Sequence, residues 1–135
     1  MFQKSVLSLL CCFIIVGCGS RTGVGVKEYY LLNEFDSKIN YMQASNIIHD
    51  MSQYCSSGLY KYKRHDFKNI RKNIISSELD YMGKSYFMSI EIELADNNTS
   101  HIKIYDYYNN KNTRNMAKTI SEWVNKNSTE CVQGF

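Results

Sequence analysis

The sequence contains no proline, and it lacks the motifs that mark many catalytic and metal sites. No serine stands in a GxSxG pattern, and no two cysteines have CxxC spacing. The three histidines, His49, His65 and His101, show neither HxH nor HxxxH spacing. These absences argue against nucleophilic catalysis and against a metal site. We therefore expect a protein that is not an enzyme and carries no cofactor.

The net charge is also low, at +3, because the sequence has 16 Lys and Arg residues and 13 Asp and Glu residues. This excess is too small to indicate nucleic acid binding. The longest apolar run, residues 5–16, is shorter than the roughly 20 residues that a membrane-spanning helix needs. Lys4 precedes the run and Gly17-Cys18 follow it. A charged start, an apolar middle and a small residue at the end are typical of a secretory signal.

The end of that run, Ile15-Val16-Gly17-Cys18, resembles the lipobox of bacterial lipoproteins. The resemblance implies that residues 1–17 are a signal peptide, that cleavage occurs before Cys18, and that Cys18 is lipidated. Two or more acyl chains there would hold the protein stably on a membrane. Gly19, where enterobacterial sorting uses Asp for inner-membrane retention, favours the outer membrane. The expected location is the bacterial cell envelope, on the outer membrane facing the periplasm.

The lipoprotein resemblance also bears on the cysteines. Cys11 and Cys12 leave with the signal and Cys18 takes the lipid, so that Cys55 and Cys131 remain in an oxidising compartment. We predict a Cys55–Cys131 disulfide. The alternative is a pair of free buried thiols.

The mature chain is long enough for one small domain. We expect residues 18–38 to be the lipidated N-terminus and a tether, since residues 19–28 are rich in glycine. Residues 39–135 are expected to form a single domain. Residues 29–32 fit either a short edge strand or a segment packed on the domain.

Two helices are expected, one at each end of that domain. A helical apolar stripe over residues 39–57 predicts the first, with Asn40 and Gln43 as its capping pair. Met116, Ile120, Trp123 and Val124 give the second its apolar face, and Asn112 or Thr113 is expected to cap it.

Between the helices the apolar period changes to two. Strands are predicted over residues 59–63, 86–94 and 101–108. Residues 66–77 fit both helical and strand spacing, and we predict a strand because the turn signal at 82–84 suits a hairpin. The predicted fold class is α+β, in the order helix, four antiparallel strands, helix, with both helices on one face of the sheet.

Three groups of residues are candidate binding or catalytic sites. A basic run fits either binding to anionic lipid headgroups or a solvated sheet edge: Lys61, Lys63, Arg64, Lys68, Arg71 and Lys72. A tyrosine set fits either a protein or glycan partner or half-buried packing: Tyr105, Tyr107 and Tyr108, with Tyr60 and Tyr62. Glu91 and Glu93 lie roughly 7 Å apart on one strand face, which we interpret as solvated.

Taken together, these features predict a lipid-anchored envelope protein that acts as a non-catalytic binding module. It would contact the membrane through acyl chains on Cys18 and bind a protein partner of the envelope, without nucleic acid. The alternative is an inhibitor or immunity protein for an envelope-directed toxin or hydrolase. A small hydrolase that uses His49, His65 or Glu91 is the third interpretation.

Overall fold

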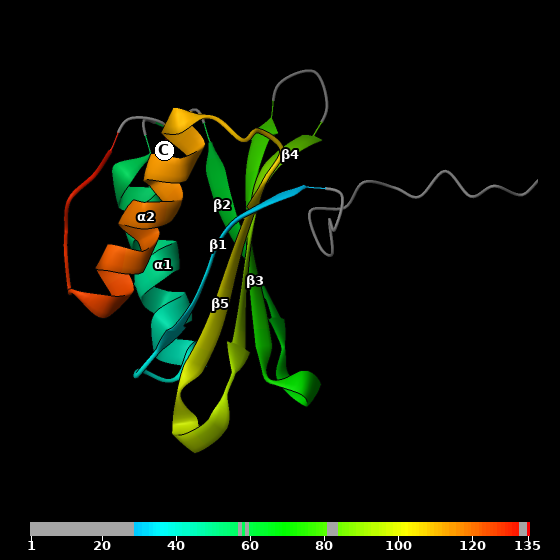
Figure 1. Cartoon of the computed structure of the whole chain (residues 1–135). Coiled ribbons are helices and arrows are strands. Elements are labelled where there is room, and N and C mark those ends of the chain that lie inside the picture. The colour runs from blue at the N-terminus through cyan, green and yellow to red at the C-terminus, as the bar shows by residue number, and fades with distance from the viewer. Residues whose placement is uncertain (1–28, 57, 59, 81–83, 133–134) are drawn as a thin grey trace, which may run out of the picture.

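A five-stranded antiparallel sheet with both helices on one face forms the domain in the computed structural model (Figure 1). The structure describes residues 29–132 and 135, except 57, 59 and 81–83. The elements are β1 (Tyr30–Ser37), α1 (Tyr41–Cys55), β2 (Lys61–Phe67), the 3-10 turn η1 (Lys68–Ile70), β3 (Lys72–Asp80), β4 (Lys84–Leu94), the 3-10 turn η2 (Asp96–Asn98), β5 (Ser100–Asp106) and α2 (Lys111–Asn125). The strand order is β1-β5-β4-β3-β2. The α+β class is confirmed.

β1 forms one edge of the sheet and is a fifth strand beyond the four predicted. Of the two interpretations of residues 29–32, the edge strand is the one observed. β1 pairs with β5 from Tyr30 opposite Asp106 to Ser37 opposite Ser100. The register shifts between Leu31 and Asn33, so β1 lacks the regular alternation that marks a strand in a sequence. The range 18–38, predicted as lipidated N-terminus and tether, therefore includes a strand of the domain.

Residues 66–77, which fit two periods in the sequence, belong to three elements. β2 ends at Phe67, η1 makes the turn, and β3 begins at Lys72. The strand prediction is therefore correct for residues 72–77 and wrong for the turn. Of the turn signal predicted at 82–84, residues 82 and 83 lie outside the described residues, and Lys84 begins β4.

The helix caps agree with the prediction at one helix and differ at the other. At α1, the Asn40 side chain accepts a hydrogen bond from the Gln43 backbone N–H at 2.9 Å, as predicted. At α2, Asn110 is the cap, in place of Asn112 or Thr113. The Asn110 side chain accepts from the Thr113 N–H at 3.0 Å, and the Thr113 hydroxyl accepts from the Asn110 N–H at 3.1 Å. This reciprocal pair satisfies two N–H groups of the helix start.

The hydrophobic core lies between the sheet and the two helices. Alternate residues of β4 and β5 face the helices, so that Ile90, Ile92, Ile102 and Ile104 are fully buried. Trp123 of α2 is buried against them. The intervening residues of both strands point to the opposite, open face.

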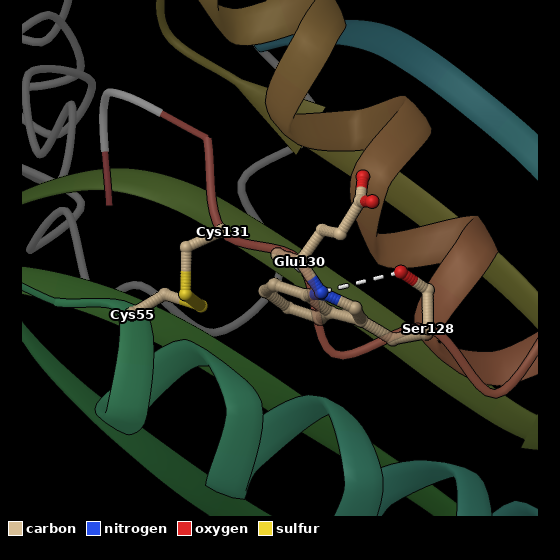
Figure 2. The surroundings of a disulfide bond; sticks show 5 residues. Cys55, Ser128, Glu130 and Cys131 are labelled. Carbon is tan, nitrogen blue, oxygen red and sulfur yellow. Dashed lines mark hydrogen bonds between the residues drawn. A yellow bond between two sulfur atoms is a disulfide. The ribbon is translucent and has the colours of Figure 1, made fainter.

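A disulfide joins the end of α1 to the C-terminal segment, which confirms the predicted pair. Figure 2 shows Cys55 facing Cys131, and their Cα atoms are 5.4 Å apart. The Trp123 indole N–H donates to the Glu130 carbonyl at 2.7 Å, and the Glu130 N–H donates to Ser128 Oγ at 3.2 Å. Covalent and hydrogen bonds thus hold the segment after α2 against both helices.

Replacing both Cys55 and Cys131 with Ser is expected to lower the free energy of unfolding by about 4–5 kcal/mol, because the bond closes a loop of 76 residues in the unfolded chain. Urea unfolding of the two proteins measures the difference. Adding a thiol reductant is expected to destabilise the natural chain and to leave the double variant unchanged. A loss below 1 kcal/mol would contradict the predicted role of the disulfide.

Candidate functional site

Glu91 and Glu93 lie on the open face of β4, and Lys72 of β3 bridges them. Lys72 Nζ is 2.8 Å from Glu91 Oε2 and 2.9 Å from Glu93 Oε1. The hydrogen bond from Lys72 holds the pKa of Glu93 below its ordinary value, although burial opposes this. Burial works to lower the pKa of Lys72, but its hydrogen bonds to Glu91 and Glu93 raise it. The two carboxylates therefore belong to an ion-pair network of the sheet.

His101 of β5 forms a second ion-pair group with β1 on the same face. Its Nδ1 is 2.6 Å from Asp36 Oδ1, and its Nε2 is 2.9 Å from Glu34 Oε1. The hydrogen bond to Asp36 raises the pKa of His101; burial opposes this, and Glu34 adds to it. His49 lies on α1 beside Asp50, and His65 lies on β2, so the histidines do not converge. In the described part of the chain, no group of three His, Cys, Asp or Glu is arranged to hold a metal.

The predicted basic run does not form one surface. Lys63 pairs with Glu78 at 2.9 Å, whereas Arg64 points to the other side of β2 and contacts Asn46 of α1. Lys72 lies between two glutamates, as described above. The remaining members are Lys61, which begins β2, Lys68, in the exposed turn η1, and Arg71, which follows it.

Ser100 and Lys103 of β5 have the SxxK spacing of a serine–lysine catalytic pair. Residues three apart on a strand point to opposite faces. Ser100 is fully buried, and Lys103 lies on the open face, 3.6 Å from Glu34. The strand therefore separates the two side chains.

The tyrosine set occupies different environments. Tyr105 is half-buried on the open face, whereas Tyr62 is buried on the helix side of β2. Tyr107 and Tyr108 follow β5 and are each 49% exposed. Tyr60 is half-buried just before β2. The set therefore does not form one surface, because Tyr62 and Tyr105 lie on opposite faces of the sheet.

One end of the sheet carries a row of five aromatic rings. The ring centroids are 5.6 Å apart for Tyr29 and Tyr107, 4.9 Å for Tyr107 and Tyr108, 6.2 Å for Tyr108 and Phe87, and 5.7 Å for Phe87 and Tyr60. These residues come from the beginnings of β1, β2 and β4 and from the end of β5, which meet at this end. We call them the aromatic row.

A small pocket opens beside the aromatic row, with a volume of about 70 Å³. Four of its walls are the rings of Tyr60, Tyr62, Phe87 and Tyr108. Its other lining residues are Ser77, Met88, Asp106, Thr113 and Met116. We call it the Asp106 pocket.

Two irregular features of the backbone build this pocket. A bulge in β3 falls between Ser76 and Glu78, and Ser77 Oγ there accepts the Met88 N–H at 2.9 Å. After β5, the Asp106 carboxylate accepts the Tyr108 N–H at 2.8 Å, which turns the chain towards α2. Bulges recur next to functional sites because they redirect side chains.

Asp106 is the chemically distinctive residue of the pocket, since it is an ionisable residue that is only 3% exposed. Burial raises its pKa from 3.8 to about 6, against the opposing effect of the Tyr108 N–H. Burial also raises the pKa of the neighbouring Tyr62, as do Tyr60 and Asp106. Within the described residues, no ion pair joins Asp106 to a lysine, arginine or histidine. It is therefore a buried carboxyl without a cation.

Sequence reasoning missed Asp106, because an aspartate at the end of a strand resembles an ordinary turn residue. A signal was present in the alternation of β5. Asp106 is in phase with Ile102 and Ile104, which both face the core. An ionisable residue in phase with an apolar face is thus the pattern that locates the pocket.

Replacing Asp36 with Asn is expected to lower the pKa of His101, because the variant loses the charge that raises it. NMR titration of the His101 imidazole measures this pKa directly. In the folded chain the pKa of His101 is raised, so its protonated form stabilises the fold at a pH below the pKa of the unfolded chain. The variant should therefore be less stable than the natural chain at acid pH, and equally stable at a pH above the folded pKa of His101. Asp50→Asn, on α1, is the control and should leave His101 unchanged. An unchanged titration in Asp36→Asn would refute the pairing.

Replacing Asp106 with Asn is expected to raise the free energy of unfolding by about 1–2 kcal/mol at pH 7.5, with allowance for solvent screening. Because the folded pKa of Asp106 is raised to about 6, its ionised form destabilises the fold above that pH. Most of the difference should therefore disappear by about pH 4. Urea unfolding at both pH values measures it, and the exposed Asp50→Asn should change stability by less than about 0.5 kcal/mol. A destabilised Asp106→Asn at pH 7.5 would contradict this.

Among the described residues, no helix has the length and apolarity needed to cross a membrane. Comparison with protein-family models, curated proteins and solved structures finds no match to this chain.

Proposed function

We propose that the chain is a lipid-anchored protein of the bacterial envelope that binds a ligand at the Asp106 pocket and performs no catalysis. The proposal of binding rests on one observation, a buried carboxyl in a pocket lined by aromatic residues, to which no described residue brings a cation. A charge in such a place destabilises the fold, and perturbed ionisable groups in pockets cluster at functional sites.

The contents of the pocket favour binding over catalysis. Of its two aliphatic hydroxyl groups, Ser77 Oγ accepts the Met88 N–H, and the Thr113 hydroxyl donates to the Tyr108 carbonyl at 2.9 Å. Among the described residues that line it, Asp106 is the one carboxyl, and none is a histidine or a lysine. Among the described residues that line the pocket, neither aliphatic hydroxyl is paired with a histidine or lysine base, which is the arrangement that activates a serine or threonine nucleophile.

The anchor is supported by the lipobox-like end of the first apolar run, Ile15 to Cys18. The chain from Cys18 joins the sheet at Tyr30, whose partner across the ladder is Asp106. The 11 residues from 19 to 29 span at most roughly 40 Å when fully extended. In the proposed arrangement, the pocket lies at the end of the domain to which the anchor connects.

Intact-mass spectrometry of protein extracted from its own membranes tests the anchor. The expected mass is that of residues 18–135 plus at least a diacylglycerol, because cleavage before Cys18 follows its lipidation. Cys18→Ser is expected to keep residues 1–17 and to gain no acyl mass, whereas Cys12→Ser, inside the signal, should be processed normally. Natural protein that retains Met1 or lacks acyl mass would refute the anchor and leave the pocket untouched.

A further inference from the structure

Asp106 stands apart from the other buried carboxyl of the sheet. Glu78 is nearly as buried, at 4% exposure, and its charge is balanced by Lys63 at 2.9 Å. Asp106 receives one hydrogen bond, from the Tyr108 N–H, and no cation from the described residues. Buried charges in folded proteins are nearly always paired. The geometry thus leaves a place for a positive charge inside the pocket.

The walls of the pocket suit a cation as well. Tyr60 and Phe87 meet edge to face at 80°, and Phe87 and Tyr108 lie nearly parallel at 14°. All three residues line the same pocket as Asp106. The faces of aromatic rings attract cations, most strongly where water is excluded. A pocket lined by aromatic rings and one carboxyl can hold a positive charge in two ways, by cation–π attraction and by an ion pair.

The size and the carboxyl chemistry narrow the class of cation. A volume of about 70 Å³ is far below the roughly 300–1,000 Å³ of pockets for drug-sized ligands, so only the end of a ligand enters. The Asp106 carboxyl has lone pairs beyond the one that accepts the Tyr108 N–H, and these can accept further hydrogen bonds. A cation that carries N–H groups supplies the charge and the donors together. A quaternary ammonium carries no N–H group, whereas a primary ammonium carries three.

We propose that the Asp106 pocket binds a primary ammonium group, which pairs with the Asp106 carboxylate and is flanked by the rings of Tyr60, Phe87 and Tyr108. This deepens the proposed binding function and does not depend on the lipid anchor. Free small amines and the ethanolamine headgroup of phospholipids carry the same group. The headgroup is the nearer source if the anchor at Cys18 brings this end of the domain to a bilayer.

The test is an NMR titration of the full chain in micelles of an amine-free detergent. Ethanolamine hydrochloride is the probe, and ethylene glycol, which has the same number of heavy atoms and no charge, is the matched control. Saturable shifts of the Met88 and Met116 methyl signals are expected with ethanolamine alone. Equal responses to both compounds, or no saturable response to either, would overturn the proposal.

Two variants assign the effect to the carboxyl. Asp106→Asn keeps the shape of the side chain and is expected to weaken ethanolamine binding at least tenfold, with its fold checked by circular dichroism. Asp50→Asn removes an equal charge from the exposed surface of α1 and should bind as the natural chain does. Unchanged binding by Asp106→Asn would overturn the proposal, even if ethanolamine bound elsewhere.

A pH series gives an independent readout. Among the described residues, the titratable groups that line the pocket beside Asp106 are the phenols of Tyr60, Tyr62 and Tyr108. Because the folded Asp106 has a pKa of about 6, binding should be roughly tenfold weaker at pH 5 than at pH 8. Affinity that is constant over this range would contradict the ion pair.

Short-chain lipids added to the micelles distinguish a lipid headgroup from a free amine as the source of the ammonium group. Phosphatidylethanolamine is the probe, and phosphatidylglycerol, which has no ammonium group, is the control. Shifts at Met88 and Met116 with the ethanolamine lipid, lost in Asp106→Asn, would identify the headgroup as a ligand. A response to free ethanolamine without a response to the lipid would identify a soluble amine. A response to both lipids alike would count against recognition of the ammonium group.

Discussion

The structure depends on the alternation of side chains along β4 and β5. Ile90 and Ile92 of β4 stand opposite Ile104 and Ile102 of β5, and all four face the helices. Burying one such side chain stabilises the fold by roughly 1.5–3 kcal/mol. Because the period is two, a slip of one residue would expose these isoleucines and turn the charged residues between them inward. The cross-strand ion pairs of the open face favour the same register.

The same alternation explains which parts of the fold were predictable. β4, β5 and both helices have regular apolar periods. The pairing of Cys55 with Cys131 was predicted from the lipoprotein resemblance, which implies other fates for the remaining three cysteines. For β1 the sequence left two interpretations of residues 29–32 open and did not indicate the strand's extent to Ser37, because the register shift after Leu31 interrupts its pattern. The cap of α2 was missed for another reason. Asparagines stand at 109, 110 and 112, and only the reciprocal bonds with Thr113 distinguish Asn110 from its neighbours.

The Asp106 pocket could not be found from local sequence, because its walls come from β2, β3, β4, the end of β5 and the start of α2. Tyr60 and Thr113, which both line the pocket, are far apart in the chain and come close together only when the sheet forms. The pocket also has a cost in stability, since it holds a charge away from water. Proteins commonly keep such destabilising groups where function needs them. The loop closed by Cys55 and Cys131 is a stabilising feature large enough to offset that cost.

The position of the disulfide has a mechanical consequence. The covalent loop from Cys55 to Cys131 contains β2 to β5 and α2, whereas β1 lies outside it. A force that pulls on the chain before Tyr30 therefore loads the ladder between β1 and β5 first. β1 is an edge strand, held by its hydrogen bonds to one neighbour and by the ion pairs of Glu34 and Asp36. Under tension the domain would yield first by peeling this strand and next at α1, which ends at Cys55, while the loop from Cys55 to Cys131 stays closed.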